Sequence, residues 1–239
     1  LTYVAGENTF FRGLKKLLPG RYLIWQDGKL EIHRYWKPEF HPDESKTLED
    51  WADEIHNTLK EIMPEVKTAD ERVESFLSGG VDSSYVLAMS DADQADCCGY
   101  EEERFDESVL AEKTAQLLGR KFSRSIITPE QFFDIVPYVM YNMEQPLGDA
   151  SAIVFTLGCN ATAEHTKICY SGEGSDEFFG GYNMYRNAER YGENLKNFYV
   201  GNTNIMKEDE KQKILKKYDP DVLPIELARG IYEETEGLD

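Results

Sequence analysis

The stretch Ser78-Gly79-Gly80-Val81-Asp82-Ser83-Ser84 decides the fold, because it joins a β-prone run, 73–77, to an apolar run that begins at Tyr85. A strand, a glycine turn and a helix together form the arrangement that binds phosphate in α/β proteins. Two glycines allow a tight turn and the close approach of a ligand, so that backbone N–H groups converge on an anion. The serine hydroxyls and the positive end of the helix dipole would add to that attraction.

Asp82 is the unusual member of this turn. Two like charges about 4 Å apart repel by roughly 4 kcal/mol at an effective dielectric of about 20, so a carboxylate beside phosphate needs a cation between them. Mg²⁺ prefers carboxylate, water and phosphate oxygens, and Asp82 therefore indicates magnesium. The alternative is a turn without a ligand, in which Ser and Asp only cap the helix. The spacing matches neither a Walker A loop nor a Rossmann turn.

The composition, with 41% hydrophobic and 30% charged residues among 239, is typical of a soluble globular protein. The net charge of −19 argues against a nucleic-acid partner, because binding to nucleic-acid phosphates relies on Lys and Arg. No run of 18 apolar residues and no signal-peptide pattern is present, so no membrane span or secretion is expected. The four cysteines show no metal-ligand spacing, which predicts reduced core residues of a cytoplasmic protein: Cys97, Cys98, Cys159 and Cys169.

Alternating β-prone and helical segments predict an α/β fold, a parallel sheet of about five strands flanked by helices. The expected strands are 73–77, 96–100, 122–127 and 167–171. The expected helices are 82–90, 107–118, 129–143, 150–165 and 175–190, followed by a charged helix over 208–218. Ahead of them, 48–66 has helical spacing, with Thr47 as its N-cap and Asp50 three residues later.

The first 37 residues show a different pattern. Two β-prone runs, 21–26 and 29–36, flank Asp27-Gly28, which is a strong signal for a β-hairpin. Residues 38–47 have the composition of a linker. We therefore expect a hairpin unit at 1–37 that is separate from the α/β domain.

A second turn of small and acidic residues, Ser171-Gly172-Glu173-Gly174-Ser175-Asp176-Glu177, follows the expected strand 167–171. Helix capping and the helix dipole alone would explain acids at such a position. The carboxyl ends of parallel strands, however, share one crevice, so both turns should open onto it. Two acid-bearing turns that face one crevice predict a metal–nucleotide site.

The first turn resembles the PP-loop of the ATP pyrophosphatases, and the two turns together resemble those of the glutamine-hydrolysing asparagine synthetases. Asp106-Glu107 and Gln145-Pro146-Leu147-Gly148-Asp149-Ala150-Ser151-Ala152 also resemble that family. The resemblance covers most of residues 1–200. It implies that 1–37 is a remnant of an N-terminal glutaminase domain. Residues 48–239 would be an ATP-binding domain truncated at its C-terminus.

The resemblance also implies a reaction and its residues. ATP would activate the side-chain carboxylate of aspartate as β-aspartyl-AMP, with release of pyrophosphate, and ammonia from glutamine would displace AMP. Asp82 and Asp176 would ligate Mg²⁺, and Glu173 would act on the intermediate. Nine residues would contact the nucleotide, and those of the first turn would bind its pyrophosphate: Leu77, Ser78, Gly79, Gly80, Asp82, Ser83, Cys98, Ser171 and Gly172. The implied partners are small molecules and the protein's own glutaminase domain. Whether the protein forms a homodimer stays an open question.

Three interpretations remain open: the amide ligase, a β-lactam synthetase-like cyclase that shares both turns, and a nucleotide-binding domain without catalysis. The resemblance implies that the family's synthetase domain continues beyond the part that corresponds to residues 48–239, and that this continuation carries a lysine that contacts the phosphates. We therefore expect this stretch by itself to be inactive or impaired. Asp149 stands where some members carry an arginine, so the group that binds the substrate carboxylate stays unassigned.

Overall fold

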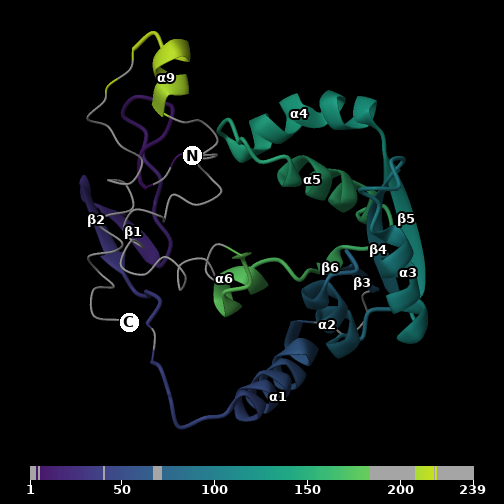
Figure 1. The fold of residues 1–239 in the computed structure, drawn as a ribbon. Coiled ribbons are helices and arrows are strands. Elements are labelled where there is room, and N and C mark those ends of the chain that lie inside the picture. The colour runs from purple at the N-terminus through teal and green to yellow at the C-terminus, as the bar shows by residue number, and fades with distance from the viewer. Residues whose placement is uncertain are drawn as a thin grey trace. The chain divides into compact units, whose positions relative to one another are not determined.

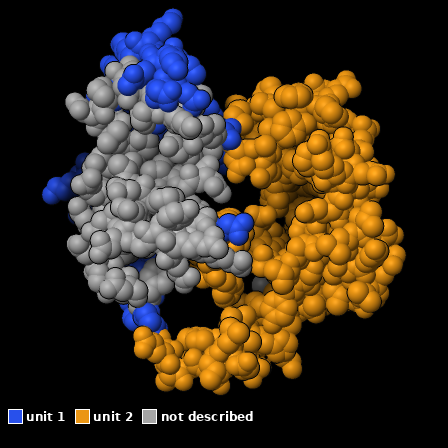
Figure 2. Space-filling model, viewed as in Figure 1, with its two compact units in different colours: residues 1–42, 143–148, 183–239 blue, residues 43–142, 149–182 orange. Residues whose placement is uncertain are grey.

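The computed structural model describes residues 4, 6–39, 41–66, 72–183, 208–217 and 219. The chain divides into two compact units, which Figure 2 shows in different colours. One unit contains 1–42, 143–148 and 183–239, and the other contains 43–142 and 149–182. The first boundary falls within the expected linker, 38–47, while the assignment of the two parts to named domains stays a prediction.

The larger unit is built on a four-stranded parallel sheet (Figure 1). Its strands are β3 (Val73–Phe76), β4 (Gln94–Tyr100), β5 (Lys121–Ile127) and β6 (Ile168–Tyr170), in the order β5-β4-β3-β6. Each neighbouring pair is parallel. The predicted parallel α/β fold is therefore confirmed, with four strands among the described residues where about five were expected.

Helices flank this sheet, as predicted. They are α1 (Leu48–Val66), α2 (Val81–Met89), α3 (Ser108–Leu117), α4 (Pro129–Met143), α5 (Ser151–Thr162) and α6 (Ser175–Phe179). The prediction of a helix over 150–165 was too long at its C-terminal end. The predicted helix 175–190 is interrupted after Phe179, because Gly180 takes a φ of 64° and ends α6. Residues 184–190 of that prediction lie outside the described part.

The two faces of the sheet differ, because successive side chains of a strand point to opposite sides. On β4, Ala95 and Cys97 join the buried core with Leu87 of α2 and Ala111 of α3. The alternate positions of β4, among them Asp96, face α5, where Thr162 donates a hydrogen bond to the Asp96 carboxylate. One face is thus an apolar core, and the other contains polar groups beneath α5.

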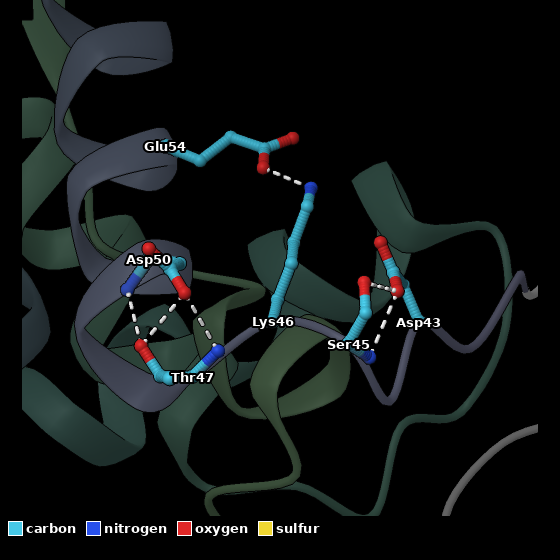
Figure 3. Close-up of polar contacts among 6 residues, drawn as sticks. All are labelled: Asp43, Ser45, Lys46, Thr47, Asp50 and Glu54. Atoms are coloured by element: carbon cyan, nitrogen blue, oxygen red, sulfur yellow. Dashed lines mark hydrogen bonds and ion pairs between the residues drawn. The ribbon is translucent and has the colours of Figure 1, made fainter.

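The start of α1 shows the predicted capping arrangement (Figure 3). The backbone N–H and the hydroxyl of Thr47 each donate to Asp50 Oδ2 over 2.8 Å, and the Asp50 N–H donates to Thr47 Oγ1 over 3.2 Å. This reciprocal pairing satisfies donors that the first helical turn leaves without partners. The backbone hydrogen bond from Thr47, followed by that from its hydroxyl, lowers the pKa of Asp50.

The smaller unit contains the predicted hairpin, with β1 (Arg21–Gln26) antiparallel to β2 (Lys29–Arg34). Asp27 and Gly28 have φ values of 52° and 76°, the positive angles that a tight two-residue hairpin turn requires.

A short helix, α9 (Glu208–Ile214), stops before the predicted end at 218, and Tyr218 is not among the described residues. Across the described ranges, no helix combines the length and apolar character needed to cross a membrane.

Candidate nucleotide site

Both acid-bearing turns lie where the strand order of the sheet reverses. From β3 the chain continues to β4 and β5 on one side, and β6 returns to pair with β3 on the other side. In parallel α/β sheets, ligands bind at this reversal, beyond the carboxyl ends of the strands. The first turn follows β3 and the second follows β6, so the topology places both at the expected position.

The two turns are in contact through their backbones. A Cβ atom added at Gly172 would lie 2.7 Å from the Ser83 nitrogen and 3.0 Å from the Asp82 carbonyl carbon. Real Cβ atoms are essentially never this close to backbone atoms, so the second turn can approach α2 only with glycine at 172. The sequence suggested that the turns share a crevice, and the structure shows that they touch.

Hydrogen bonds between serines hold the first turn. Ser83 Oγ accepts a hydrogen bond from the Ser78 N–H over 3.1 Å and lies 3.0 Å from Ser78 Oγ. The Gly80 N–H donates to Ser78 Oγ over 3.2 Å, and Gly79 has a φ of 83°. The hydroxyls expected to bind phosphate are therefore also used to shape the turn, while the start of α2 presents N–H groups without intrahelical partners.

The second turn is arranged differently. Ser175 Oγ donates to the Gly172 carbonyl over 2.8 Å, and the Glu173 N–H donates to Ser171 Oγ over 3.1 Å. Asp176 turns back over the end of α6, because a Cβ atom at Gly181 would lie 1.9 Å from its Oδ1. Gly181 therefore leaves the space that the Asp176 carboxylate occupies.

A single cavity of about 920 Å³ connects the two turns, within the larger unit. All the predicted site residues except Gly79 line it: Leu77, Ser78, Gly80, Asp82, Ser83, Cys98, Ser171, Gly172, Glu173 and Asp176. The structure thus brings these residues together, while their individual roles stay predictions. Burial raises the pKa of the Cys98 thiol, which favours its neutral form over a reactive thiolate.

The cavity is strongly acidic. Seven carboxylates line it: Asp82, Asp96, Glu107, Asp149, Glu173, Asp176 and Glu177. No set of three or more His, Cys, Asp or Glu side chains in the described ranges is close enough to hold a metal ion by itself. Mg²⁺ is usually bound by one or two carboxylates together with water and substrate phosphates, so the chemistry of the acidic donors fits this ion.

Sequence reasoning missed the aromatic wall of the cavity, to which β3, α4 and α5 contribute. The rings of Phe76 and Phe155 lie 5.2 Å apart between centroids, and Phe132 lines the same cavity. Gly158 lets α5 approach the strands, since a Cβ atom there would lie 2.9 Å from Cys98 Sγ. Apolar walls with a few polar groups are typical of sites for small ligands.

The loop between β4 and α3 is held by one acid. Asp106 accepts hydrogen bonds from the Ser108 N–H over 3.2 Å, from Ser108 Oγ over 2.9 Å and from Arg124 over 2.5 Å. The Ser108 hydroxyl is the first cause of a lowered pKa at Asp106. This anchoring fixes the neighbours Phe105 and Glu107, which both line the cavity.

The fold and the site define a parallel α/β domain with a glycine-serine turn at the reversal point of the sheet. Residues 54–229 match the model of the asparagine synthase family. This match covers more than half of the chain, and the chain belongs to that family.

Known relatives include proteins named asparagine synthetase and a protein named amidase. The chain is 28% identical to asparagine synthetase (glutamine-hydrolyzing) 1 of Bacillus subtilis, over 98% of this chain and 43% of that protein. It is 29% identical to a putative asparagine synthetase (glutamine-hydrolyzing) of Mycobacterium tuberculosis, over 78% of this chain and 30% of that protein. Amidase chry2 of Gibberella zeae is 32% identical over 75% of this chain and 30% of its own length. The chain spans less than half the length of these relatives.

Among solved structures, glutamine-dependent NAD+ synthetase from Acinetobacter baumannii, in complex with adenosine diphosphate, is similar with a TM-score of 0.40. The identity is 13%, and the match covers 86% of this chain and 47% of that chain. NH3-dependent NAD synthetase from Campylobacter jejuni has a TM-score of 0.39 at 16% identity, over 77% and 96% of the two chains. These likenesses are distant, and the fold described above rests on its own strands and helices.

Proposed function

We propose that this chain is the nucleotide-binding part of an ATP-dependent amide ligase that converts aspartate to asparagine. The side-chain carboxylate of aspartate attacks the α-phosphorus of ATP, so that β-aspartyl-AMP forms and pyrophosphate leaves. Ammonia from glutamine, supplied by the protein's own glutaminase domain, then attacks the acyl carbon, and the bond to AMP breaks. Membership of the asparagine synthase family supports this reaction.

The observation that carries the proposal is the backbone contact between the two turns. Gly172 packs against Ser83 and Asp82, so the serine turn and the acidic turn open together onto one cavity. Adenylation needs both components in one place: N–H donors for the phosphates, and carboxylates that hold a cation between those phosphates. A helix cap alone would not require the close approach that only glycine allows.

We assign a role to each of the following residues, all of which line the cavity or begin α2 beside it. Ser78, Gly80 and the first turn of α2 would bind the pyrophosphate through hydroxyl and N–H groups. When bound, Mg²⁺ would neutralise phosphate charge and orient the leaving pyrophosphate, with Asp82 and Asp176 as its carboxylate ligands. Glu173, beside Gly172, would act where the intermediate forms or is aminated.

Two measurements test the proposal. Calorimetric titration of this chain with ATP, with and without Mg²⁺, should show weak binding that depends on the metal. Equal affinity with and without Mg²⁺ would contradict the metal assignment. In a longer protein that carries this chain, mass spectrometry should detect AMP, pyrophosphate and asparagine from ATP, aspartate and ammonia. ADP and inorganic phosphate as products would contradict adenylation, and turnover with another acid instead of aspartate would contradict the substrate.

A further inference from the structure

Glu74 is a fully buried acid in the centre of the sheet. It lies on β3, four positions before the first turn, and its side chain is 0% exposed. Its register partners are Gln94 on β4 and Cys169 on β6, so strands enclose it on both sides. Burial of an ionised carboxylate is costly unless partners compensate the charge, which makes its surroundings informative.

The partners of Glu74 are incomplete. Arg72 Nη2 lies 2.7 Å from Glu74 Oε1, which forms an ion pair without hydrogen-bond geometry. Neither oxygen of Glu74 accepts a hydrogen bond from any other group in the described part of the chain. Buried carboxylates usually accept hydrogen bonds at both oxygens, so a donor for Glu74 remains to be found.

A second acid, Asp96 on β4, lies on the same face of the sheet as Glu74, because the strand register places it opposite Phe76, two positions further along β3. Asp96 Oδ1 accepts a hydrogen bond from Gln94 Nε2 over 2.9 Å, and Thr162 Oγ1 is 3.5 Å from Oδ2. The backbone carbonyl of Asp96 accepts a hydrogen bond from the Leu77 N–H over 2.9 Å, directly before the nucleotide turn. The carboxylate lines the large cavity and a smaller one of about 180 Å³.

Two ionised carboxylates are both acceptors and repel each other, whereas one proton between them supplies the missing donor and removes one charge. We propose that Glu74 and Asp96 share one proton in the folded chain and form a proton-dependent brace between β3 and β4, directly beneath the nucleotide turn. Burial first, and then the neighbouring Asp96 carboxylate, raise the pKa of Glu74 to about 7, while Arg72 opposes this shift.

Other titratable groups lie near Glu74 and Asp96, but none of those in the described part of the chain donates a hydrogen bond to Glu74. They come from β4, α5 and the segment after it, and β6: Cys98, Cys159, Glu164, His165 and Cys169. Burial raises the pKa of each of these three thiols, to about 12 at Cys169, so they stay neutral near pH 7. Glu164 and His165 line the smaller cavity but are exposed, and solvent and salt screen their charges.

The sign of the pH effect follows from the raised pKa. In the unfolded chain Glu74 loses its proton near its ordinary pKa of 4.5, whereas the folded chain keeps the proton up to about 7. The contribution of the pair to stability is therefore complete below about pH 4.5 and falls as pH rises to about 7. Above that range the loss is complete and this contribution no longer changes.

Carbon-13 NMR of the side-chain carboxyl groups in this chain tests the proposal without any nucleotide. The Glu74 carboxyl resonance should titrate near neutral pH, at about 7. In Asp96→Asn, the amide donates permanently, so the Glu74 midpoint should move to lower pH. A Glu74 midpoint near 4.5 in the wild-type chain, or a midpoint that Asp96→Asn leaves unchanged, would overturn the shared proton.

Urea unfolding provides a second readout. Between pH 4.5 and pH 8 the folding equilibrium constant of the wild-type chain should fall by roughly tenfold or more relative to Glu74→Gln, whose amide replaces the proton. Glu112→Gln, at an exposed site on α3, is the matched control and should keep the wild-type dependence. Parallel pH profiles for the wild-type chain and Glu74→Gln would overturn the brace. If Glu74→Gln does not fold, the NMR titration of the wild-type chain still decides.

Discussion

The turn after β3 and the turn after β6 lie in contact and line one cavity, yet they are built in different ways. In the first, Ser78 and Ser83 hydrogen-bond to each other, and α2 continues for nine residues with a single acid in its first turn. In the second, α6 has five residues, ends at Gly180, and carries acids at Asp176 and Glu177. The first turn is thus shaped as a rigid group of donors, whereas the second supplies negative charge. A nucleotide site needs both, since donors hold the phosphates and acids hold the cation.

Gly172→Ala should have the largest effect, because it disrupts the backbone contact between the two turns. A Cβ atom 2.7 Å from the Ser83 nitrogen forces one turn to move, so we expect loss of detectable Mg-ATP binding in calorimetry. Gly119→Ala is the control: its φ of 67° also strains an alanine, but nothing lies within 4 Å. Reduced stability with intact binding is expected there. Wild-type affinity in Gly172→Ala would show that the contact is not needed.

Asp82→Asn and Asp176→Asn should have the next largest effect. Together they test whether the acids of the two turns bind the same cation. Each removes a charged oxygen ligand, and we expect Mg-ATP affinity to fall by roughly tenfold or more, with a smaller dependence on Mg²⁺ concentration. The double variant should be little weaker than either single variant if the two acids share the metal. Fully additive losses would indicate that they act independently.

Ser83→Ala and Ser175→Ala compare how each turn is held. Ser83 is buried and its hydroxyl interacts with both the backbone N–H and the hydroxyl of Ser78, so its removal leaves a donor unpaired. We expect a loss of about 1–3 kcal/mol in the free energy of unfolding. Ser175 makes one hydrogen bond to a carbonyl in a partly exposed place, and its loss should cost about 1 kcal/mol or less. Chemical denaturation of both variants measures the difference, and a reversed order would contradict it.

Glu173→Gln should have the smallest effect on nucleotide binding. Glu173 lies in the second turn with Asp176, the proposed metal ligand, but we assign Glu173 to the intermediate, so Mg-ATP affinity should stay within about twofold of wild type. In a longer protein with activity, the same variant should lose formation of the amide product. A large loss of Mg-ATP affinity would place Glu173 among the metal ligands instead.

Short-range signals in the sequence were sufficient for the local structure. Asp27-Gly28 predicted the hairpin, Thr47 and Asp50 predicted the cap of α1, and Ser78–Ser84 predicted a turn between strand and helix. Each depends on backbone angles or hydrogen bonds among residues a few positions apart, which the residue types themselves control. The limit of such signals appears at Gly180, whose left-handed backbone angle ends α6 within the helix that the sequence predicted over 175–190.

Only the tertiary structure decided what meets across the sheet. The contact of Gly172 with Ser83, the position of buried Glu74 on the same face of the sheet as Asp96, and the aromatic wall with Phe155 each join residues far apart in the chain. These contacts depend on the order of the strands, with β6 and β4 on either side of β3, and on α5 covering one face of β4. The local spacing of apolar residues does not predict strand order. The residue types of the site were determined by the sequence, whereas their distances, partners and proton affinities follow from long-range packing, because burial and neighbouring charge exist only in the folded chain.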